Sequence, residues 1–406
     1  MRVNFDLDPL MVRSDVFLTL TPGVGRAIVS AFCTGLIGVG LARFAYTPLL
    51  PAVVEAHWFA PAAAAYLGAA NLAGYLAGAF LGRPLSRNFA VVTLLRAMML
   101  AATASFFACG FPLGFLWFFL WRFAAGFAGG AMMVLAAPTV LAHVPANRRG
   151  IAGGLIVMGV GTGIVASGTL IPLLLHYGVQ QAWIGLGVLS AALTALAWNG
   201  WPKGPLPQTS AAAHVRPPPS RVLRALYLEY ALNAGGWVPH MLFFVDYVAR
   251  GLGKGVVMGA EFWVAFGLSA TLGPLLAGHV ADRIGFRPAL RCAFLLQIFA
   301  IAIPALNVTS APWLFASSIV IGGFVTGTVT LVLGRIHELL PQHPDEQKAA
   351  WSVATIAFAL CQAIAAYGLS FVFARSGGDY QVLFLIGVVA MTLSLLIDLA
   401  ASERAR

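Results

Sequence analysis

The chain has 406 residues, of which 60% are hydrophobic and only 9% are charged, and its formal net charge is +10. Soluble domains carry about 25% charged residues, so this composition excludes a soluble domain and indicates a polytopic membrane protein. The apolar runs are about 20 residues long, which suits helices that cross a hydrocarbon core roughly 30 Å thick and excludes the strands of an outer-membrane barrel. The basic excess therefore indicates orientation in a lipid bilayer, and no nucleic acid partner is expected.

Twelve apolar spans are predicted, six on each side of a polar break at 201–224. The break contains six prolines and no acidic residue, so it predicts a cytoplasmic linker, either a simple tether or a regulatory or lipid-binding segment. The fold class expected is an all-α membrane protein with twelve transmembrane helices in two pseudo-symmetric six-helix bundles. The predicted domains are a cytoplasmic N-terminal segment (1–25), a first bundle (26–200), the linker (201–224) and a second bundle (225–406). The predicted spans are 26–50, 61–81, 89–109, 112–142, 150–175, 180–200, 224–248, 256–279, 289–307, 312–334, 349–374 and 380–400.

The distribution of basic residues predicts which side of the membrane each loop occupies. Most of the 24 lysine and arginine residues fall in the termini, the linker and every second loop, whereas the other loops carry only Arg250, Lys254 and Arg375. Since cytoplasmic loops are enriched in such residues, both termini are expected on the cytoplasmic side of a bacterial-type inner membrane. Residues 1–15 are too acidic and polar for a cleaved signal peptide. A monomer is expected.

Two arginines lie deep inside predicted spans, where burying a charge is costly and usually serves a function. Arg43 shares a helical face with Tyr46 and Thr47 in the first span. It predicts either an anchor for an anionic group on a substrate, because arginine can grip a carboxylate with two parallel bonds, or a conformational ion pair or helix-end bond. Arg122 in the fourth span could share a dianion with Arg43, serve in proton coupling, or fix its helix by bonding backbone groups.

The two halves repeat one another at an offset of about 200 residues, as parallel-repeat transporters do. Leu76-Ala-Gly78 recurs as Leu276-Ala-Gly278, and Arg83 recurs as Arg283. Such folds hold a substrate between the halves near the membrane midplane, so a site between the two bundles is expected.

The seventh span carries a polar stripe made of Glu229, Asn233, Gly236, His240 and Tyr247, which are spaced to share one helix face. A polar stripe on a lipid-bounded helix must face protein or water, so it predicts either the lining of a cavity or a buried structural network. Glu229 and His240 can both exchange a proton in such a site, and either is a candidate for proton coupling.

Small and isolated residues give further expectations. Gly74, Gly78 and Gly82 recur at four-residue spacing, which predicts close approach of two helices. No metal or cofactor site is expected, because histidines and cysteines are scattered without ligand spacing. The four cysteines are predicted to be small core residues: Cys33, Cys109, Cys292 and Cys361.

Several motifs resemble one family. Gly278-His-Val-Ala-Asp-Arg-Ile-Gly-Phe-Arg287 resembles the loop motif of the major facilitator superfamily, G-x-x-x-D-R-x-G-R-R, and Arg122-Phe-Ala-Ala-Gly126 resembles its R-x-x-x-G helix motif. Within that superfamily, Ala42–Pro48, Asn71–Tyr75 and Tyr230–Met241 are similar to the YbfB/YjiJ-type branch. The resemblance covers nearly the whole chain from residue 26 and implies alternating-access transport, with spans 1, 4, 7 and 10 lining the cavity. It names no substrate.

Charges at the two mouths of the expected cavity are candidate gates. Asp282, with Arg283 and Arg287, is expected to form a conformational latch by accepting bonds from the start of the fifth span, or else to be a solvated loop charge. The corresponding position of the first half is Gly82, so a latch is expected on one side only. Asp246 is expected nearer the outer surface, as a gate or mouth charge.

The working hypothesis is a proton-coupled secondary transporter, not an enzyme, that moves a small organic anion. Its coupling residue would be Glu229 or His240. The substrate-binding residues would be Arg43, Tyr46, Asn71, Tyr75, Arg122, Asn233 and His240.

An efflux carrier for drugs or sugars is the main alternative, for which the aromatic residues Trp117, Trp121, Trp237 and Phe244 would matter more. An intramembrane enzyme is a weaker alternative, because Gly267-Leu-Ser-Ala270 has no histidine placed to activate its serine. A receptor that does not transport is the third.

Overall fold

The computed structural model describes residues 22–145, 148–202 and 220–403, and in these ranges it contains helices and the turns between them but no strand. The segment before residue 22 and most of the predicted linker lie outside the described residues. The first half contains α1 (Pro22–Gly35), the π-helix η2 (Leu36–Leu41), α2 (Tyr46–Glu55), α3 (Pro61–Asn88), α4 (Val91–Cys109), α5 (Phe115–Leu141), α6 (Arg149–Leu175) and α7 (Val179–Ala197). The second half contains α8 (Arg221–Gly236), α9 (Val238–Asp246), the π-helix η4 (Tyr247–Gly251), α10 (Gly255–Ile284), α11 (Phe286–Ala305), α12 (Ala311–Leu339), α13 (Pro344–Arg375) and α14 (Tyr380–Glu403).

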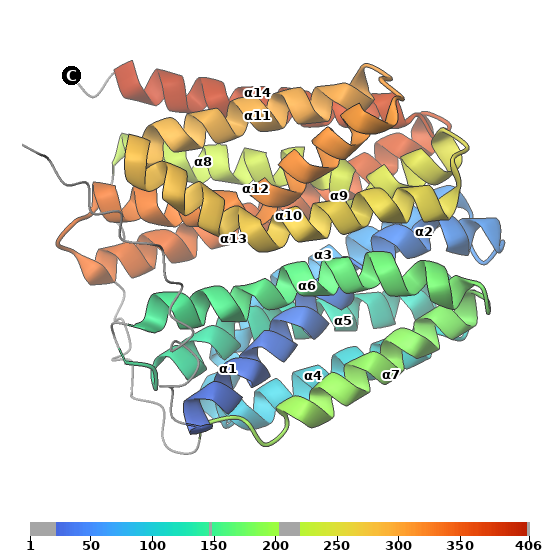
Figure 1. The fold of residues 1–406 in the computed structure, drawn as a ribbon, viewed down its shortest axis with the longest axis horizontal. Coiled ribbons are helices and arrows are strands. Elements are labelled where there is room, and N and C mark those ends of the chain that lie inside the picture. Colours follow the sequence, from blue (N-terminus) through green and yellow to red (C-terminus); the bar gives the residue numbers. More distant parts are fainter. Residues whose placement is uncertain (1–21, 146–147, 203–219, 404–406) are drawn as a thin grey trace, which may run out of the picture.

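The helices form two groups that lie side by side, α1 to α7 below and α8 to α14 above in Figure 1. Each group is a six-helix bundle if α1, η2 and α2 are counted as one interrupted rod and α8, α9 and η4 as another. The prediction of an all-α fold with two six-helix bundles is therefore confirmed. We call the end where α1 begins and α14 ends the terminal end, on the left of Figure 1, and the opposite end the distal end.

Eleven helical segments in the described ranges are long and apolar enough to cross a membrane. The remaining predicted span, 224–248, corresponds to α8, α9 and η4, which are interrupted at Trp237 and are individually too short to qualify. Several helices run past the predicted limits of the apolar runs. For example, α3 extends to Asn88, because its last turns carry arginines whose long side chains can reach the polar interface while the backbone stays helical.

Glycines let α3 and α5 approach each other closely, as their four-residue spacing predicts. A Cβ atom at Gly74 or Gly78 would lie 2.0 Å from a backbone oxygen of α5, which is far too short for a real contact. On α5, a Cβ atom at Gly126 would lie 1.9 Å from the Asn71 oxygen. Only glycine permits this backbone-to-backbone packing.

Large apolar side chains cover the outside of the bundles. Leu116 and Phe299 are 69% and 68% exposed, as is expected of helices surrounded by lipid tails. The prediction that all four cysteines lie in the core is wrong for Cys292, which is exposed on α11. Its small apolar thiol suits a lipid-facing surface as well as a core, so composition alone cannot separate the two positions.

The two bundles contact each other from their middle to their distal end. A Cβ atom at Gly161 of α6 would lie 2.1 Å from the Thr271 hydroxyl of α10, and one at Gly168 would lie 2.8 Å from the Val264 side chain. Toward the terminal end, in contrast, a Cβ atom at Gly154 of α6 would meet nothing within 4 Å. The bundles are therefore closed against each other distally and apart at the terminal end.

Candidate functional site

The first rod is interrupted near its middle. After the π-helix η2, residues 42–45 form a turn before α2 begins at Tyr46. Pro48 contributes to the interruption because proline has no N–H to continue the helical hydrogen bonds. Gly40 lies against Gly163 of α6, where a Cβ atom would be 2.7 Å from the Gly163 Cα. The interruption places Arg43 on an irregular segment that packed helices surround.

The second half contains an equivalent interruption. Helix α8 ends at Gly236, Trp237 lies between the helices, and α9 starts at Val238 with Pro239 in its first turn. The Trp237 N–H still donates to the Asn233 carbonyl at 3.3 Å, so the rod bends without coming apart. Proline early in a helix and glycine at the end of another are residues that allow such a break.

The two interrupted rods meet at the centre of the molecule. The Arg43 Nε and Nη2 atoms approach the Met241 sulfur at 3.3 and 3.2 Å, and Nη2 also donates to Gln362 Oε1 on α13. The Thr47 hydroxyl donates to the Met241 carbonyl oxygen. The Phe44 and Trp237 rings stack with centroids 6.4 Å apart. Arg43 therefore connects the first bundle to two helices of the second.

Arg43 is a buried cation without a carboxylate partner among the described residues. The residue is only 7% exposed, and its guanidinium carbon lies 5.2 Å from the ring centroids of Phe44 and Tyr75 and 5.6 Å from that of Trp237. None of the five ion pairs in the described ranges includes it. Aromatic faces attract a cation, but they do not neutralise its charge.

Arg122 lies inside the first bundle instead. It is 2% exposed, its Nη1 atom donates to the Ala42 carbonyl at 2.7 Å, and its guanidinium carbon is 4.4 Å from the Tyr46 ring centroid. Asn71 donates to the same Ala42 carbonyl at 3.2 Å and to the Arg122 carbonyl at 3.1 Å. The Tyr46 hydroxyl donates to the Ala64 carbonyl at 2.7 Å. These three predicted site residues therefore support the interrupted rod from behind. Tyr75, a fourth predicted site residue, lies against Arg43 instead, with its ring centroid 5.2 Å from the guanidinium carbon.

The polar stripe of the seventh span packs within the second bundle. Asn233 donates to Gln297 Oε1 at 3.0 Å, and His240 Nε2 lies 2.7 Å from the Ser317 hydroxyl. Because Ser317 donates its own proton to the Ala300 carbonyl, it accepts from His240, which places a proton on Nε2. His240 Nδ1 is buried and has no hydrogen-bond partner in the part of the chain that the structure describes. In this conformation the stripe faces α11, α12 and α14 rather than Arg43.

Glu229 lies near the terminal end of the second bundle. It is 2% exposed, and its Oε2 atom is buried with no hydrogen-bond partner among the described residues. The charged groups that act on it are Asp398, Arg335, Arg287 and Arg291. Asp398 itself pairs with Arg287 at 3.6 Å and with Arg291. Glu229 is therefore a buried carboxyl beside a charge cluster, separate from the centre where Arg43 lies.

The predicted latch residues are not engaged in this conformation. Asp282 and Arg283 are exposed at the end of α10, and Asp282 has no hydrogen-bond or ion-pair partner within the described ranges. Arg287 pairs with Asp398 of α14 in its own bundle. Gly285, with φ of +87°, makes the tight turn that follows, a backbone conformation that favours glycine. This arrangement agrees with the separation of the bundles at the terminal end.

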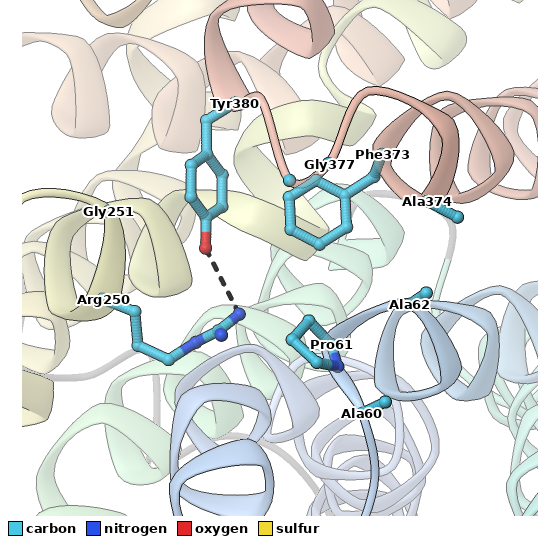
Figure 2. A pocket seen from close by; sticks show the side chains of 10 residues that line it. Ala60, Pro61, Ala62, Arg250, Gly251, Phe373, Ala374, Gly377 and Tyr380 are labelled. Atoms are coloured by element: carbon cyan, nitrogen blue, oxygen red, sulfur yellow. Dashed lines mark hydrogen bonds between the residues drawn. The ribbon is translucent and has the colours of Figure 1, made fainter.

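A hollow of about 410 Å³ lies at the distal end, between the start of α3 and the loops of the second bundle. Figure 2 shows Arg250 and Tyr380 on one side of it and Pro61 on the other. Asp246 is fully buried and receives bonds from Arg250 and from the Tyr380 hydroxyl, the latter at 2.7 Å. The interpretation of Asp246 as a charge near one mouth agrees with this position.

Sequence reasoning missed Gln362, the acceptor of an Arg43 bond on α13. The signal was present, because Gln362 is a polar residue in the middle of a predicted span, where polar groups are costly. Met241 stands out in the sequence only as the last residue of the Tyr230–Met241 motif. Its thioether has no feature in the sequence that distinguishes it from a core methionine.

The sequence of the chain is similar to those of known proteins. A sequence model of the family described as "Uncharacterised MFS-type transporter YbfB" matches residues 35–399. The curated protein "Probable transporter SCO4007" from Streptomyces coelicolor is 30% identical over 281 residues, which is 67% of this chain and 64% of that protein. The match thus spans slightly less than two thirds of the length of this relative.

Solved structures share the fold at low sequence identity. The chain is similar to a variant of the nucleoside transporter NupG (TM-score 0.73, 14% identity, 93% of this chain and 99% of that one). It is also similar to the xylose transporter XylE from E. coli in a partially occluded inward open conformation (TM-score 0.71, 14% identity, 93% and 97% covered) and to a D-xylose-proton symporter (TM-score 0.69, 14% identity, 91% and 96% covered).

Two six-helix halves related by a parallel repeat are the architecture of the major facilitator superfamily. Since the family model covers most of the chain, the protein belongs to the YbfB-type family of that superfamily. The resemblance seen in the sequence is therefore confirmed. Membership of a transporter family also agrees with the expectation that the chain is not an enzyme.

Proposed function

We propose that this protein is a secondary transporter that carries a small organic anion between the two bundles by alternating access. The observation that carries the proposal is Arg43, a buried cation at the junction of the bundles that has no carboxylate partner among the described residues. A charge this deep in a membrane protein is costly unless it serves a substrate or an ion. An anion bound at Arg43 would offset that cost.

The contacts between the bundles support alternating access. Within the described ranges, the hydrogen bonds that join the bundles come from Arg43, Thr47 and Trp263, all between the middle and the distal end. With the termini on the cytoplasmic side, as the basic loops predict, this is the conformation in which the centre opens inward. The reverse conformation would close the terminal end, where Asp282 is a candidate to latch.

Coupling to protons is the second part of the proposal, and Glu229 is its main candidate. Its Oε2 atom, buried without a partner among the described residues, would bind a proton, and the neighbouring cluster of Arg287, Arg291 and Asp398 lies where the bundles are apart. Protonation of Glu229 would change the charge of that cluster. It would thereby shift the balance between the open and the closed conformation of the terminal end. His240 is the alternative, because its Nδ1 atom is buried and has no partner within the described ranges.

Uptake into proteoliposomes tests the proposal. The purified chain is reconstituted, a pH gradient is imposed, and uptake of labelled benzoate and succinate is compared with uptake of xylose and uridine. We expect an organic anion to accumulate and the Arg43→Ala variant to lose this uptake by about 100-fold or more, since a charge-assisted pair is removed. Arg96→Gln is the matched control, because Arg96 lies within a span but bonds the Trp198 carbonyl, away from the centre.

A second variant separates coupling from binding. Glu229→Gln should abolish acceleration by the pH gradient yet preserve exchange of internal for external substrate, and His240→Gln tests the alternative in the same way. Accumulation of xylose, uridine or a hydrophobic drug that is unaffected by Arg43→Ala would instead favour a carrier for neutral compounds. Trp237 and the other aromatic residues at the centre would then be the binding groups.

A further inference from the structure

Among the described residues, Arg43 donates hydrogen bonds only to neutral acceptors. Two of its nitrogen atoms face the Met241 sulfur at 3.3 and 3.2 Å, and Nη2 also donates to Gln362 Oε1. A thioether is a weak acceptor, and an amide oxygen carries no net charge. Charge-assisted bonds to an anion are roughly twice as strong as neutral ones, so an anion would displace these acceptors from the guanidinium.

Gln362 brings an unused donor to the same place. The residue is 1% exposed, and its Nε2 atom is buried without a hydrogen-bond partner among the described residues. Its Oε1 atom accepts from Arg43, so the amide nitrogen lies next to the guanidinium. Buried donors are almost always paired in folded proteins, and one left unpaired beside an unneutralised cation points to a missing acceptor. The two residues come from opposite bundles.

We propose that Arg43 and Gln362 together bind the carboxylate of an aromatic monocarboxylate, a substrate class that deepens the transport function proposed above and rests on it. One carboxylate oxygen would take the bond that Gln362 Oε1 now accepts. The other would replace the Met241 sulfur, and Gln362 Nε2 would then donate to the bound group. The site would thus supply donors from both halves to one small anion.

The charge at the centre limits the substrate to one negative charge. Arg43 is the cation there, and the guanidinium of Arg122 faces Tyr46 and Trp183 within the first bundle, where it bonds the Ala42 carbonyl. The sequence left open that both arginines share a dianion. The structure separates their guanidinium groups, so a second carboxylate would be buried at the centre without a cation, at a large cost.

The surroundings of Arg43 favour an aromatic body on that anion. Phe44, Tyr75 and Trp237 lie within 5.2 to 5.6 Å of its guanidinium carbon. Phe44 also lies 5.9 Å from the Trp263 ring, with an interplanar angle of 52°. Aromatic rings prefer offset or edge-to-face neighbours, which such a set of differently inclined rings provides for a planar ligand.

Binding would also act on the conformation, because the acceptors it displaces join the bundles. Arg43 belongs to the first half, and Met241 and Gln362 belong to the second. In this conformation these bonds hold the centre together. An anion bound to the guanidinium would replace these bonds with its own bonds to Arg43 and Gln362. Binding of the anion and contact between the two bundles would therefore depend on each other.

Equilibrium binding to the full-length protein in nanodiscs tests this assignment with four probes. Labelled benzoate is the reference ligand, and three unlabelled compounds compete with it. Benzamide lacks the negative charge, phthalate adds a second one, and cyclohexanecarboxylate lacks the aromatic ring. We expect benzoate to bind best, cyclohexanecarboxylate to be about 10-fold weaker from the lost ring contacts, and benzamide and phthalate to be about 100-fold weaker.

Three substitutions assign the residues. Gln362→Glu places a carboxylate beside Arg43 and should weaken benzoate binding by about 100-fold or more, whereas Gln362→Leu, of similar volume, should weaken it about 10-fold through loss of one donor. Met241→Leu removes the competing sulfur and should tighten binding, about 3-fold. A gain of affinity is the opposite of what general damage to the fold would cause. Elution as a single species in size-exclusion chromatography checks that each variant is folded.

Benzoate binding unchanged by Gln362→Glu, or equal binding of benzamide or phthalate, would overturn the inference. So would uptake of an anion in the proteoliposome assay that depends on Arg43 but not on Gln362, and in that case the proposed transport of anions would still hold. Uptake of neutral compounds alone, independent of both residues, would overturn the two proposals together.

Discussion

The two ends of the junction between the bundles differ sharply. From the middle toward the distal end, α6 and α10 are so close that Gly161 leaves no space for a Cβ atom, and the Trp263 indole donates to the Ser167 hydroxyl at 3.2 Å across the junction. At the terminal end, Gly154 has nothing within 4 Å and Asp282 is exposed. The helices are the same at both ends, so composition does not cause the difference.

The comparison shows which small residues matter in this conformation. Gly161 and Gly154 both belong to the same glycine-rich helix and look alike in the sequence. One is a closure contact and the other faces open space. Under alternating access, Gly154 would become a closure contact when the terminal end closes, and Gly161 would then lose its contact. Each glycine would therefore permit close helix packing in one of the two conformations.

The largest effect on stability should come from removing the charge that stabilises the distal end of the second bundle. Asp246→Asn removes the carboxylate from the fully buried side of the Arg250 pair and leaves that arginine unpaired. We expect a loss of about 2 kcal/mol in stability, below the value for a fully buried pair because the Arg250 side chain is 20% exposed. The melting temperature of the purified protein measures it.

The control is Asp345→Asn, which breaks an exposed pair with Lys348 at 3.1 Å and should leave the melting temperature unchanged. Equal melting temperatures for the Asp246 variant and the unmodified protein would mean that this ion pair contributes nothing to the stability of the second bundle.

Gly161→Val should disfavour the distal contact. Its side chain would overlap Thr271, and overpacking of this kind costs about 1–3 kcal/mol, equivalent to a shift of about 5- to 150-fold between conformations. A cysteine introduced at Val264, in a background without native cysteines, should then react faster with a membrane-impermeant maleimide. Gly154→Val is the matched control and should not raise this rate, because a Cβ atom at Gly154 meets nothing within 4 Å in this conformation. Equal rates for both variants would contradict the closure assigned to Gly161.

The smallest effect is expected at the terminal end. Asp282→Asn should leave the melting temperature unchanged, because the exposed carboxylate has no partner among the described residues in this conformation. If Asp282 latches the opposite conformation, the same variant should slow substrate exchange in proteoliposomes, since closure of the terminal end would lose a bond to a helix start. A large drop in melting temperature would show that Asp282 is already engaged.

Arg43 and Gln362 show what could be predicted about the site. Arg43 stands out from the sequence because a charge inside an apolar run is rare, and the same argument applies, more weakly, to Gln362. The positions of Asn233 and His240 on one helix face also follow from their spacing. Which neighbours that face meets does not, because a helix buried on all sides presents polar stripes to its own bundle as readily as to a cavity.

The sequence by itself determined the membrane-spanning class, the number of spans and the family, because hydrophobic length and loop motifs are local properties that survive without knowledge of packing. Tertiary structure alone decided that Arg43 faces the second bundle while Arg122 faces its own, and that only one end of the junction is closed. Both depend on how two rigid bundles are placed against each other. The free energies that set this placement are sums over distant residues, which no local pattern records.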